Sequence, residues 1–358
     1  MRDSRNLGID LLRIVSMALI VLRHILGFGG ILENVSLFSL NYGIAWLLDT
    51  AAECAVNCYA LITGYIYTNA KFKYSNIVSI WLQVLFYTAG IAGLFFIFMP
   101  QSVSTKIILF SFFPVMGNHY WYFTCYFGMF FFIPFFNQLL DTCSPLLSKK
   151  LFFTIVILFS ILPTIRHTDL FGAADGYSFL WLSLMYLLGG LIRRNQENIK
   201  AEKRTLLFVY LFCILSAWIS KWGIQFITLG LTGTPNNGTL LLLYTSPTML
   251  FAACTLLILF SGLKIRHMQK CILFFAPLTF GVYLIHNNNL IRENLLKNAC
   301  ISFACASPAV MLGIVTALTL SVFFSCSIID LFRIYLFRLL RIPKLTQWME
   351  QHYFVRNL

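Results

Sequence analysis

The chain has 358 residues, of which 59% are hydrophobic and 11% charged, and its mean hydropathy is +0.80. This composition excludes a soluble globular protein, which could not solvate so apolar a surface. The net charge is +13, but the basic residues lie in short segments between apolar runs, as in membrane proteins. We therefore expect no nucleic-acid partner.

Ten apolar runs predict an all-α polytopic membrane fold. Runs of about 20 residues are typical of transmembrane helices, and a helix satisfies its own backbone hydrogen bonds in lipid. The segment 105–114 is too short to cross and is expected to be re-entrant or interfacial. The predicted spans are 9–30, 43–66, 76–99, 120–140, 150–166, 177–193, 205–222, 239–263, 271–290 and 308–330.

The basic residues orient these spans. Of the 26 Lys and Arg residues, two lie in the first span, five lie in segments on one side, and the other 19 lie in segments on the opposite side. The positive-inside rule places the richer side, with the N-terminus, in the cytoplasm. An even number of spans then places both termini in the cytoplasm. The five are Lys106, Arg166, Lys221, Arg292 and Lys297.

We predict a single transmembrane domain over 1–345, followed by a basic, aromatic tail over 346–358 at the cytoplasmic interface. The loops are short, and we expect no fused extracytoplasmic domain. The first span carries internal charges and lacks a small-residue cleavage site, so it is not a cleaved signal peptide. The ten cysteines lack C-x-x-C spacing, so we expect buried small hydrophobes and no metal site.

The first span carries ionisable residues in its run IDLLRIVSMALIVLRHIL. Arg13 and His24 are 11 residues apart, which is close to three helical turns and about 16 Å along the axis. Both side chains therefore point the same way, with Asp10 near the same stripe. An ionisable group at the centre of a membrane helix costs roughly 2.5–3.5 kcal/mol, so this face must contact protein or water.

The second predicted span carries Asp49, Glu53 and Asn57 at intervals of four, which places them on one helix face. Two neighbouring carboxylates repel unless a cation lies nearby, and Arg23 or His24 would supply it. Glu53 is the candidate partner that fixes the tautomer of His24 and stabilises its cation. The alternative is a structural buried ion pair.

These residue types suit acyl transfer. A positioned neutral imidazole, such as that of His24, removes the proton of a hydroxyl that attacks a thioester. A guanidinium grips phosphate with two hydrogen bonds, which suits Arg13, and Asp10 would hold Arg13 in place. The alternative is that Arg13 extends to the inner membrane surface.

Aromatic and histidine residues gather at the predicted outer ends of two spans, where they would join His24 around an outward-facing cavity. An ordinary aromatic belt or a helix end in water also explains them. The candidate acceptor-binding residues are His119, Tyr120, Trp121, Tyr283 and His286, with Tyr122 beside them.

Four motifs in order resemble the acyltransferase-3 family of integral membrane enzymes. The first is R-x10-H, from Arg13 to His24. CYALITGYIY resembles the family's run ending in Ser-Gly-Phe/Tyr, with Thr63 in place of Ser, and HYWYF resembles its His-x-Trp segment. FGVYLIH, ending in His286, resembles its Tyr-Leu-x-His segment. The resemblance covers about residues 7–335.

This resemblance implies transfer of an acyl group, usually acetyl from acetyl-CoA as cosubstrate, to a hydroxyl of a glycan or lipid-linked sugar. Arg13 would engage CoA, and we assign Asp10, Lys71 and Lys73 to the same donor site. His24 would be the base or a transient acyl carrier, and the outer aromatic rings of Tyr120, Trp121, Tyr122 and Tyr283 would stack on the sugar. The expected location is the plasma membrane, as a multi-pass protein of the bacterial cytoplasmic membrane. The residues give no indication of oligomeric state.

Two other functions fit the composition. Intramembrane charges also mark transport paths, so a polysaccharide or lipid-linked glycan exporter without acyl transfer is one alternative, although we find no paired Gly/Pro interruptions typical of transporter repeats. A non-catalytic sensor or assembly subunit is the other. Arg13 and His24 on one helix face argue against a purely structural role.

Overall fold

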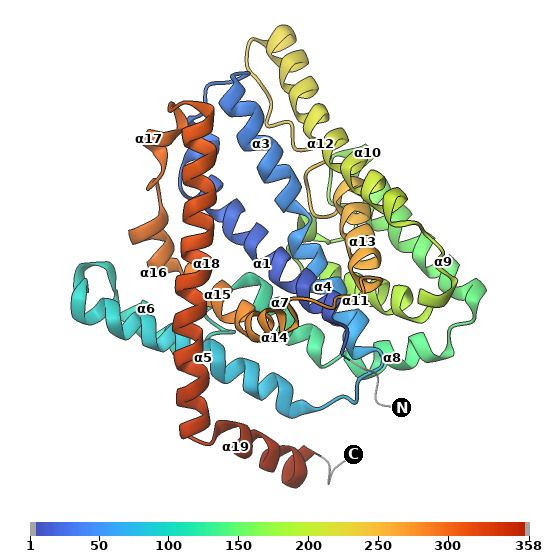
Figure 1. The fold of residues 1–358 in the computed structure, drawn as a ribbon, viewed down its shortest axis with the longest axis vertical. Helices are drawn as coiled ribbons and strands as arrows, with labels where there is room; N and C mark the ends of the chain where they lie inside the picture. Colours follow the sequence, from blue (N-terminus) through green and yellow to red (C-terminus); the bar gives the residue numbers. More distant parts are fainter. Residues whose placement is uncertain (1–4, 355–358) are drawn as a thin grey trace.

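The computed structural model describes residues 5–354, and every regular element in that range is helical (Figure 1). The predicted all-α class is therefore confirmed. Residues 355–358 of the predicted tail lie outside the described residues. The predicted domain boundary at 345 falls inside α19 (Ile342–Met349), and it stays a prediction. The start of α1 and α19 lie toward the lower end of Figure 1, and their side of the membrane also stays a prediction.

The longer helices are α1 (Leu7–Gly27), α3 (Leu40–Glu53), α4 (Ala55–Tyr67), α5 (Tyr74–Phe98), α7 (Trp121–Phe130), α8 (Ile133–Thr142), α9 (Pro145–Val156), α11 (Phe179–Arg194), α12 (Lys203–Thr232), α13 (Pro247–Ser261), α15 (Thr279–His286), α18 (Pro308–Leu339) and α19. The shorter ones are α2 (Ile31–Asn34), α6 (Thr105–Ser111), α10 (Leu162–Arg166), α14 (Gln269–Phe275), α16 (Asn289–Ile291) and α17 (Ile301–Ala304). Single turns complete the chain at η1 (Pro100–Ser102), η2 (Ile157–Ile161), η3 (Ala174–Gly176), η4 (Gln196–Asn198), η5 (Ala276–Leu278), η6 (Arg292–Leu296) and η7 (Glu350–Phe354).

Local sequence signals set several helix ends. The Asn6 side chain accepts hydrogen bonds from the backbone N–H groups of Gly8 and Ile9 and so caps α1. Pro247 and Pro308 stand at the first positions of α13 and α18, where a missing N–H costs no helical hydrogen bond. These signals fix where the helices begin, and packing decides which faces they bury.

The expected count of about ten spans is not confirmed. Among residues 5–354, six helical segments are long and apolar enough to cross a membrane, and a seventh arises if α7 and α8, bent by 60°, form one span. The six are Leu7–Asn34, Tyr74–Phe98, Pro145–Arg166, Lys203–Thr232, Gln269–His286 and Pro308–Leu339. The protein is thus a multi-pass membrane protein with several helices too short to span alone.

Three predicted spans correspond to shorter elements, for separate physical reasons. The run 43–66 breaks at Cys54 into α3 and α4. The run 177–193 forms α11, only 16 residues long, in which every residue from Trp181 to Ile192 is buried. In the run 239–263, the helix α13 begins only at Pro247. A hydropathy pattern counts apolar residues and does not detect such interruptions.

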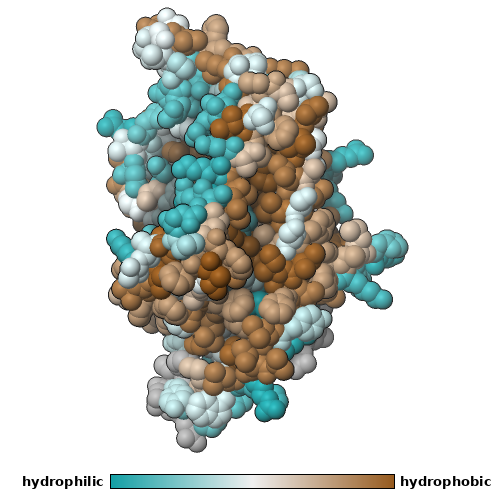
Figure 2. All heavy atoms as spheres, turned by 90° about the vertical axis from the view of Figure 1, so that its left-hand side faces the viewer, coloured by the Kyte–Doolittle hydropathy of each residue, from teal (hydrophilic) through white to brown (hydrophobic). Residues whose placement is uncertain are grey.

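Helix α1 lies at the centre of the array and contacts α3, α4, α13, α15 and α18 (Figure 1). This explains how a helix with internal charges is tolerated, because its polar face meets other helices rather than lipid. The outer helices expose apolar side chains, for example Leu231 on α12 and Ile328 on α18. On the face drawn in Figure 2, hydrophobic side chains cover most of the surface, and hydrophilic ones gather in an upper patch and in protruding tips.

Helices α4 and α11 approach each other closely at two glycines. A Cβ on Gly64 would lie 1.9 Å from the Tyr186 carbonyl oxygen, and one on Gly189 would lie 2.1 Å from the Leu61 carbonyl oxygen. Small residues allow this approach in membrane helix pairs. The Thr-Gly-Tyr motif in CYALITGYIY therefore has a packing reason for its glycine.

Helices α15 and α18 meet in the same way around a buried ion pair. Asp330 is fully buried and accepts two hydrogen bonds on one oxygen and one on the other from Arg333, together with one from Tyr87 of α5 at 2.7 Å. A Cβ on Gly281 would lie 2.0 Å from the Asp330 carboxyl carbon. The carboxylate thus fixes α15 against α5 and α18.

Replacement of Gly64 by Ala is predicted to destabilise the protein by about 1–3 kcal/mol, because the new methyl group overpacks the α4–α11 contact. Thermal unfolding of detergent-solubilised protein, followed by loss of monodisperse elution, measures the effect. The matched control is Gly313→Ala on α18, where a Cβ meets nothing within 4 Å. There the change should be neutral or slightly stabilising, and equal melting shifts for both variants would contradict the packing account.

Candidate active site

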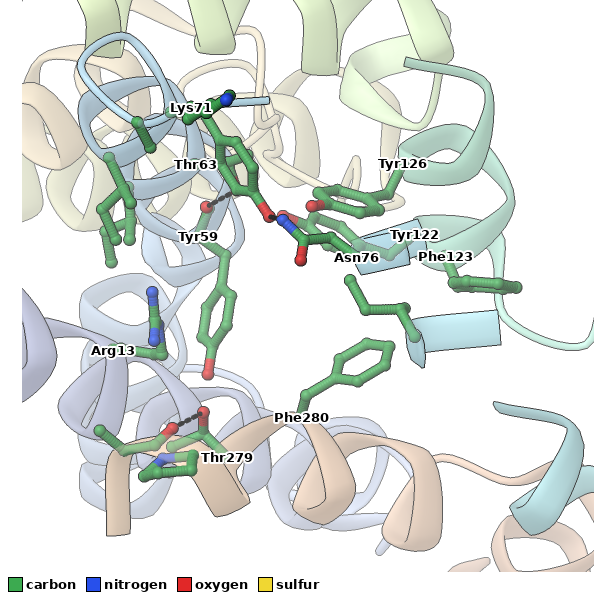
Figure 3. Close-up of a pocket in the computed structure, with 17 residues that line it drawn as sticks. Arg13, Tyr59, Thr63, Lys71, Asn76, Tyr122, Phe123, Tyr126, Thr279 and Phe280 are labelled. Atoms are coloured by element: carbon green, nitrogen blue, oxygen red, sulfur yellow. Dashed lines mark hydrogen bonds between the residues drawn. The ribbon is translucent and has the colours of Figure 1, made fainter. Parts of the chain in front are cut away.

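Three adjoining cavities run past the polar face of α1. The first, here called the Arg13 chamber, has a volume of about 450 Å³ and is lined by Arg13, Tyr59, Tyr126 and Lys71, among others. In Figure 3, Arg13 and Tyr59 lie on one side of this opening, and Tyr122, Tyr126 and Phe280 lie on the other. Two cationic side chains, Arg13 and Lys71, thus share a cavity whose other walls are mostly aromatic.

The second cavity is a constriction of only about 40 Å³, lined by Met17, Ile20 and His24 of α1 and by surrounding aromatic rings. It shares Tyr59, Tyr122 and Phe280 with the Arg13 chamber. Those three side chains therefore form the boundary between a wide polar space and a narrow one.

The third cavity, here called the Arg23 chamber, has a volume of about 510 Å³ and is the most polar of the three. It shares His24, Trp121, Tyr244 and Asn287 with the constriction. Its charged lining residues are Arg23, Asp49, Glu53, Asp175 and Arg292.

Arg13 and His24 thus line one row of cavities, as their spacing on α1 predicts. Arg13 Nη1 lies 3.8 Å from Asp10 Oδ1, which is an ion pair one helical turn apart. Asp10 also pairs with Arg5, whose Nε lies 2.5 Å from Asp10 Oδ2. The predicted contact between Asp10 and Arg13 is therefore present, but Asp10 is shared between two guanidinium groups.

Only one of the two lysines predicted to bind the donor lines a cavity. Lys71 lines the Arg13 chamber, whereas Lys73 precedes the first residue of α5, is exposed, and lines none of the three cavities. Thr63, from the same motif as Gly64, also lines the Arg13 chamber, and its hydroxyl donates to the Tyr59 carbonyl within α4.

His24 contacts another histidine rather than the expected carboxylate. His24 Nδ1 lies 2.9 Å from His286 Nε2, and the two ring centroids are 5.0 Å apart. His286 ends α15 and is 2% exposed, and its Nδ1 lies 2.6 Å from the Val282 carbonyl oxygen one turn earlier. The structure therefore brings together two imidazoles that are 262 residues apart in the sequence.

Glu53 forms an ion pair with Arg23. Glu53 is the carboxylate expected to orient His24, but the residue that contacts His24 is His286. Arg23 Nε lies 2.6 Å from Glu53 Oε2 and 3.6 Å from Asp49 Oδ1. Of the two cations considered from the sequence, it is Arg23 that neutralises these buried carboxylates. Asp49 Oδ1 is buried and accepts no hydrogen bond from the described residues, although it lines the Arg23 chamber.

Asn57 does not line the chamber with Asp49 and Glu53, and it lies in α4, beyond the break at Cys54 that ends α3. The Asn57 amide donates to the Tyr244 carbonyl at 2.8 Å and accepts from the Trp181 indole at 2.9 Å. Asn57 is thus a structural residue that holds the segment carrying Tyr244.

Of the aromatic residues predicted to bind the acceptor, Trp121 and Tyr283 line a cavity and Tyr120 does not. Trp121 lines the Arg23 chamber and packs on Tyr177 and Tyr244, with centroids 4.6 and 6.3 Å away. Tyr283 lines the constriction. Tyr120 is 1% exposed, and its hydroxyl donates to the Leu284 carbonyl at 2.6 Å. Tyr120 therefore has a structural role, because it is buried and its hydrogen bond holds the backbone of α15 in place.

His119, like Tyr120 and His286, is a predicted acceptor residue that lines none of the three cavities. Its Nε2 is buried without a hydrogen-bond partner among the described residues, and the ring packs beside Gly117. The interfacial interpretation of His119 fits this position better than a place in the chamber.

Sequence reasoning did not assign Tyr177, Tyr244, Asp175 and Arg292 to the site. Tyr244 accepts a hydrogen bond from Arg23 and lies in the non-helical stretch before α13, inside a run predicted to be helical. Burial raises the pKa of its phenol well above the usual value, so it stays protonated. Asp175 lies in the single turn η3 and Tyr177 directly follows it, and so short an element gives no periodic signal.

The cavities, the buried charges and the apolar exterior define a membrane protein with an internal polar site. A family model described as an acyltransferase domain matches residues 6–331. Comparisons with curated proteins and with solved structures found no match. The chain belongs to the acyltransferase-3 family and is a membrane acyltransferase.

The Arg23–Glu53 ion pair is predicted to contribute to stability through coupling between α1 and α3. Glu53→Gln should lower the free energy of unfolding by about 3 kcal/mol, because it leaves Arg23 short of its closest carboxylate in a largely buried place. The double variant Arg23→Gln/Glu53→Gln should lose at least about 1 kcal/mol less than the sum of the single losses. Thermal unfolding in detergent measures all three variants.

An exposed pair provides the control for this cycle. Lys297 Nζ lies 2.8 Å from Glu293 Oε2, and their side chains are 58% and 46% exposed. The hydrogen bond from Lys297 holds the pKa of Glu293 below its usual value, yet solvent screening limits such pairs to about 1 kcal/mol or less. Additive losses at Arg23 and Glu53, or equal coupling at both pairs, would contradict the proposed coupling.

Proposed function

We propose that the protein transfers an acyl group, acetyl in the simplest case, from acyl-CoA to a hydroxyl of a glycan or lipid-linked sugar. The observation that carries this proposal is the position of His24, which borders the narrow constriction between two wider polar chambers. A base in that position reaches a donor from one chamber and an acceptor from the other. A reaction between two bound substrates needs such juxtaposition.

The Arg13 chamber is the proposed donor site. Arg13 and Lys71 supply positive charge for the phosphates of CoA. The narrow constriction suits the thin pantetheine arm, which would bring its thioester to His24. Lys73 has no part in this site, and Asp10 acts by holding Arg13.

The Arg23 chamber is the proposed acceptor site. Trp121, Tyr177 and Tyr244 offer ring faces, and Asp49 offers a buried carboxylate oxygen that accepts no hydrogen bond from the described residues. Aromatic faces with a few fixed polar groups suit a sugar, which has apolar ring faces and hydroxyl donors. Glu53 shapes this chamber through Arg23 rather than acting on His24.

His24 is the proposed general base. Its imidazole removes the proton from the acceptor hydroxyl while the oxygen attacks the thioester carbonyl. The tetrahedral intermediate then collapses, the carbon–sulfur bond breaks, and the CoA thiolate takes the proton back from the imidazolium. The products are an ester on the sugar and free CoA, and His24 returns to its neutral form. We place this reaction in the plasma membrane of a bacterium.

Replacement of His24 by Ala is predicted to lower acyl transfer at least about 100-fold, the usual contribution of a general base. The measurement is transfer of labelled acetyl from acetyl-CoA to glycan acceptors by protein in nanodiscs. The control is His267→Ala, since His267 is exposed and lies in a loop before α14. Full activity in a folded His24→Ala protein would overturn the mechanism. Glycan export without acyl donor in proteoliposomes would instead favour a transporter.

Replacement of Arg13 by Gln is predicted to raise the KM for acetyl-CoA about 10- to 100-fold, because a hydrogen bond between charged groups contributes about 1.5–3 kcal/mol. The KM for the acceptor should change much less, since Arg13 lines only the donor chamber. Lys264→Gln, at an exposed loop position, is the charge-matched control. Equal effects of Arg13→Gln on both KM values would contradict the assignment of the two chambers.

A further inference from the structure

We propose that His286 is a positioning residue that holds His24 in one tautomer, with the proton on Nδ1 and the lone pair of Nε2 available toward the cavities. This inference deepens the proposed function, on which its catalytic meaning rests. It follows from two short contacts in a row, Val282 carbonyl to His286 and His286 to His24.

The first contact fixes one proton. A carbonyl oxygen only accepts hydrogen bonds, and the Val282 oxygen lies 2.6 Å from His286 Nδ1. His286 Nδ1 must therefore carry a proton and donate it. The acceptor belongs to the backbone of the same helix, α15, so the geometry does not depend on a mobile side chain.

The second contact then has one consistent assignment. In a neutral imidazole whose Nδ1 carries the proton, Nε2 is an acceptor. His286 Nε2 lies 2.9 Å from His24 Nδ1, so His24 Nδ1 must be the donor. The remaining nitrogen of His24, Nε2, keeps its lone pair, and it is this nitrogen that can accept a proton from a substrate hydroxyl.

The reverse assignment would require His286 to be a cation. Both of its ring nitrogens would then donate, and its positive charge would lie at a position only 2% exposed, against a carbonyl oxygen and a neutral imidazole. A buried charge without a counter-charge is strongly unfavourable. Arg23 and Arg292, which line the same chamber as His24, add positive charge nearby and make that cation less favourable still.

The surrounding structure holds His286 in place. Tyr120 donates to the Leu284 carbonyl at 2.6 Å and accepts a hydrogen bond from the Asn288 amide at 3.0 Å, which fixes the end of α15. Gly281, five residues before His286, packs against the Asp330 carboxylate of α18. The ring of His286 therefore projects from a helix anchored on two sides.

An imidazole differs from a carboxylate in this role. The aspartate of a Ser-His-Asp triad both orients the histidine and stabilises its cation by charge. His286 supplies orientation without negative charge, and Glu53, the carboxylate expected to orient His24, is bound to Arg23 instead. Orientation of Nε2 is thus the part of the triad function that this pair can perform.

The direct test is nitrogen NMR of the full-length protein in nanodiscs with ¹⁵N-labelled histidine, with His24 assigned by comparison with His24→Gln. Protonated and unprotonated ring nitrogens have well-separated shifts. We expect a protonated Nδ1 and an unprotonated Nε2 for His24 in the resting protein at neutral pH. A protonated Nε2 with a bare Nδ1 would overturn the proposal, whether or not the protein transfers acetyl groups.

Two variants at one position test the consequence for activity. In His286→Gln the amide oxygen can still accept the His24 proton, whereas His286→Leu has similar volume and no acceptor. We expect His286→Leu to lower kcat about 10- to 100-fold, by analogy with the partners that orient metal-bound histidines, with the KM for acetyl-CoA nearly unchanged. His286→Gln should recover most of that loss.

The outcomes separate the two proposals. Equal kcat losses in folded His286→Leu and His286→Gln would mean that hydrogen-bond acceptance at this position is not what matters, and would overturn the positioning role. If His286→Leu does not fold, the shifts of His24 in the wild-type and His286→Gln proteins decide the question. Absence of acyl transfer by the wild-type protein would overturn the proposed function and leave the tautomer to be decided by NMR.

Discussion

The ion pair between Arg23 of α1 and Glu53 of α3 is the interaction on which the site depends. Charged side chains are unfavourable in lipid, so the helix that carries Arg13, Arg23 and His24 must turn that face toward protein. The carboxylates of α3 meet it there, and α4, α13, α15 and α18 complete the enclosure around α1. The cavities follow from this requirement, because a polar face held between helices is not filled by apolar side chains.

The same requirement organises the chemistry. One helix presents Arg13 to the first chamber, His24 to the constriction and Arg23 to the last chamber. A donor with phosphates and an acceptor with hydroxyls need different surroundings, and the two chambers differ accordingly. The first combines two cations, Arg13 and Lys71, with phenol rings, whereas the last combines charges of both signs with aromatic faces. The constriction limits contact between them to the neighbourhood of His24.

Much of the site could be predicted from residue spacing. The interval from Arg13 to His24 fixes a common face by helix geometry alone, and the pairing of acidic residues with a cation follows from the cost of isolated charge. Other features depend on contacts between distant segments. Tyr120 and Trp121 are adjacent in the sequence, yet Tyr120 hydrogen-bonds to the backbone of α15 and Trp121 lines the Arg23 chamber. No local pattern distinguishes the two residues.

The sequence by itself determined the membrane class, the helical fold and the polar face of α1, because hydropathy and the helical period are local properties. The tertiary structure alone decided that His24 pairs with His286, that Glu53 pairs with Arg23, and that the runs 43–66 and 239–263 are interrupted. Those outcomes arise from packing between helices far apart in the chain. A buried polar group pairs with a group that the fold brings within reach, and its sequence neighbours do not specify which partner that is.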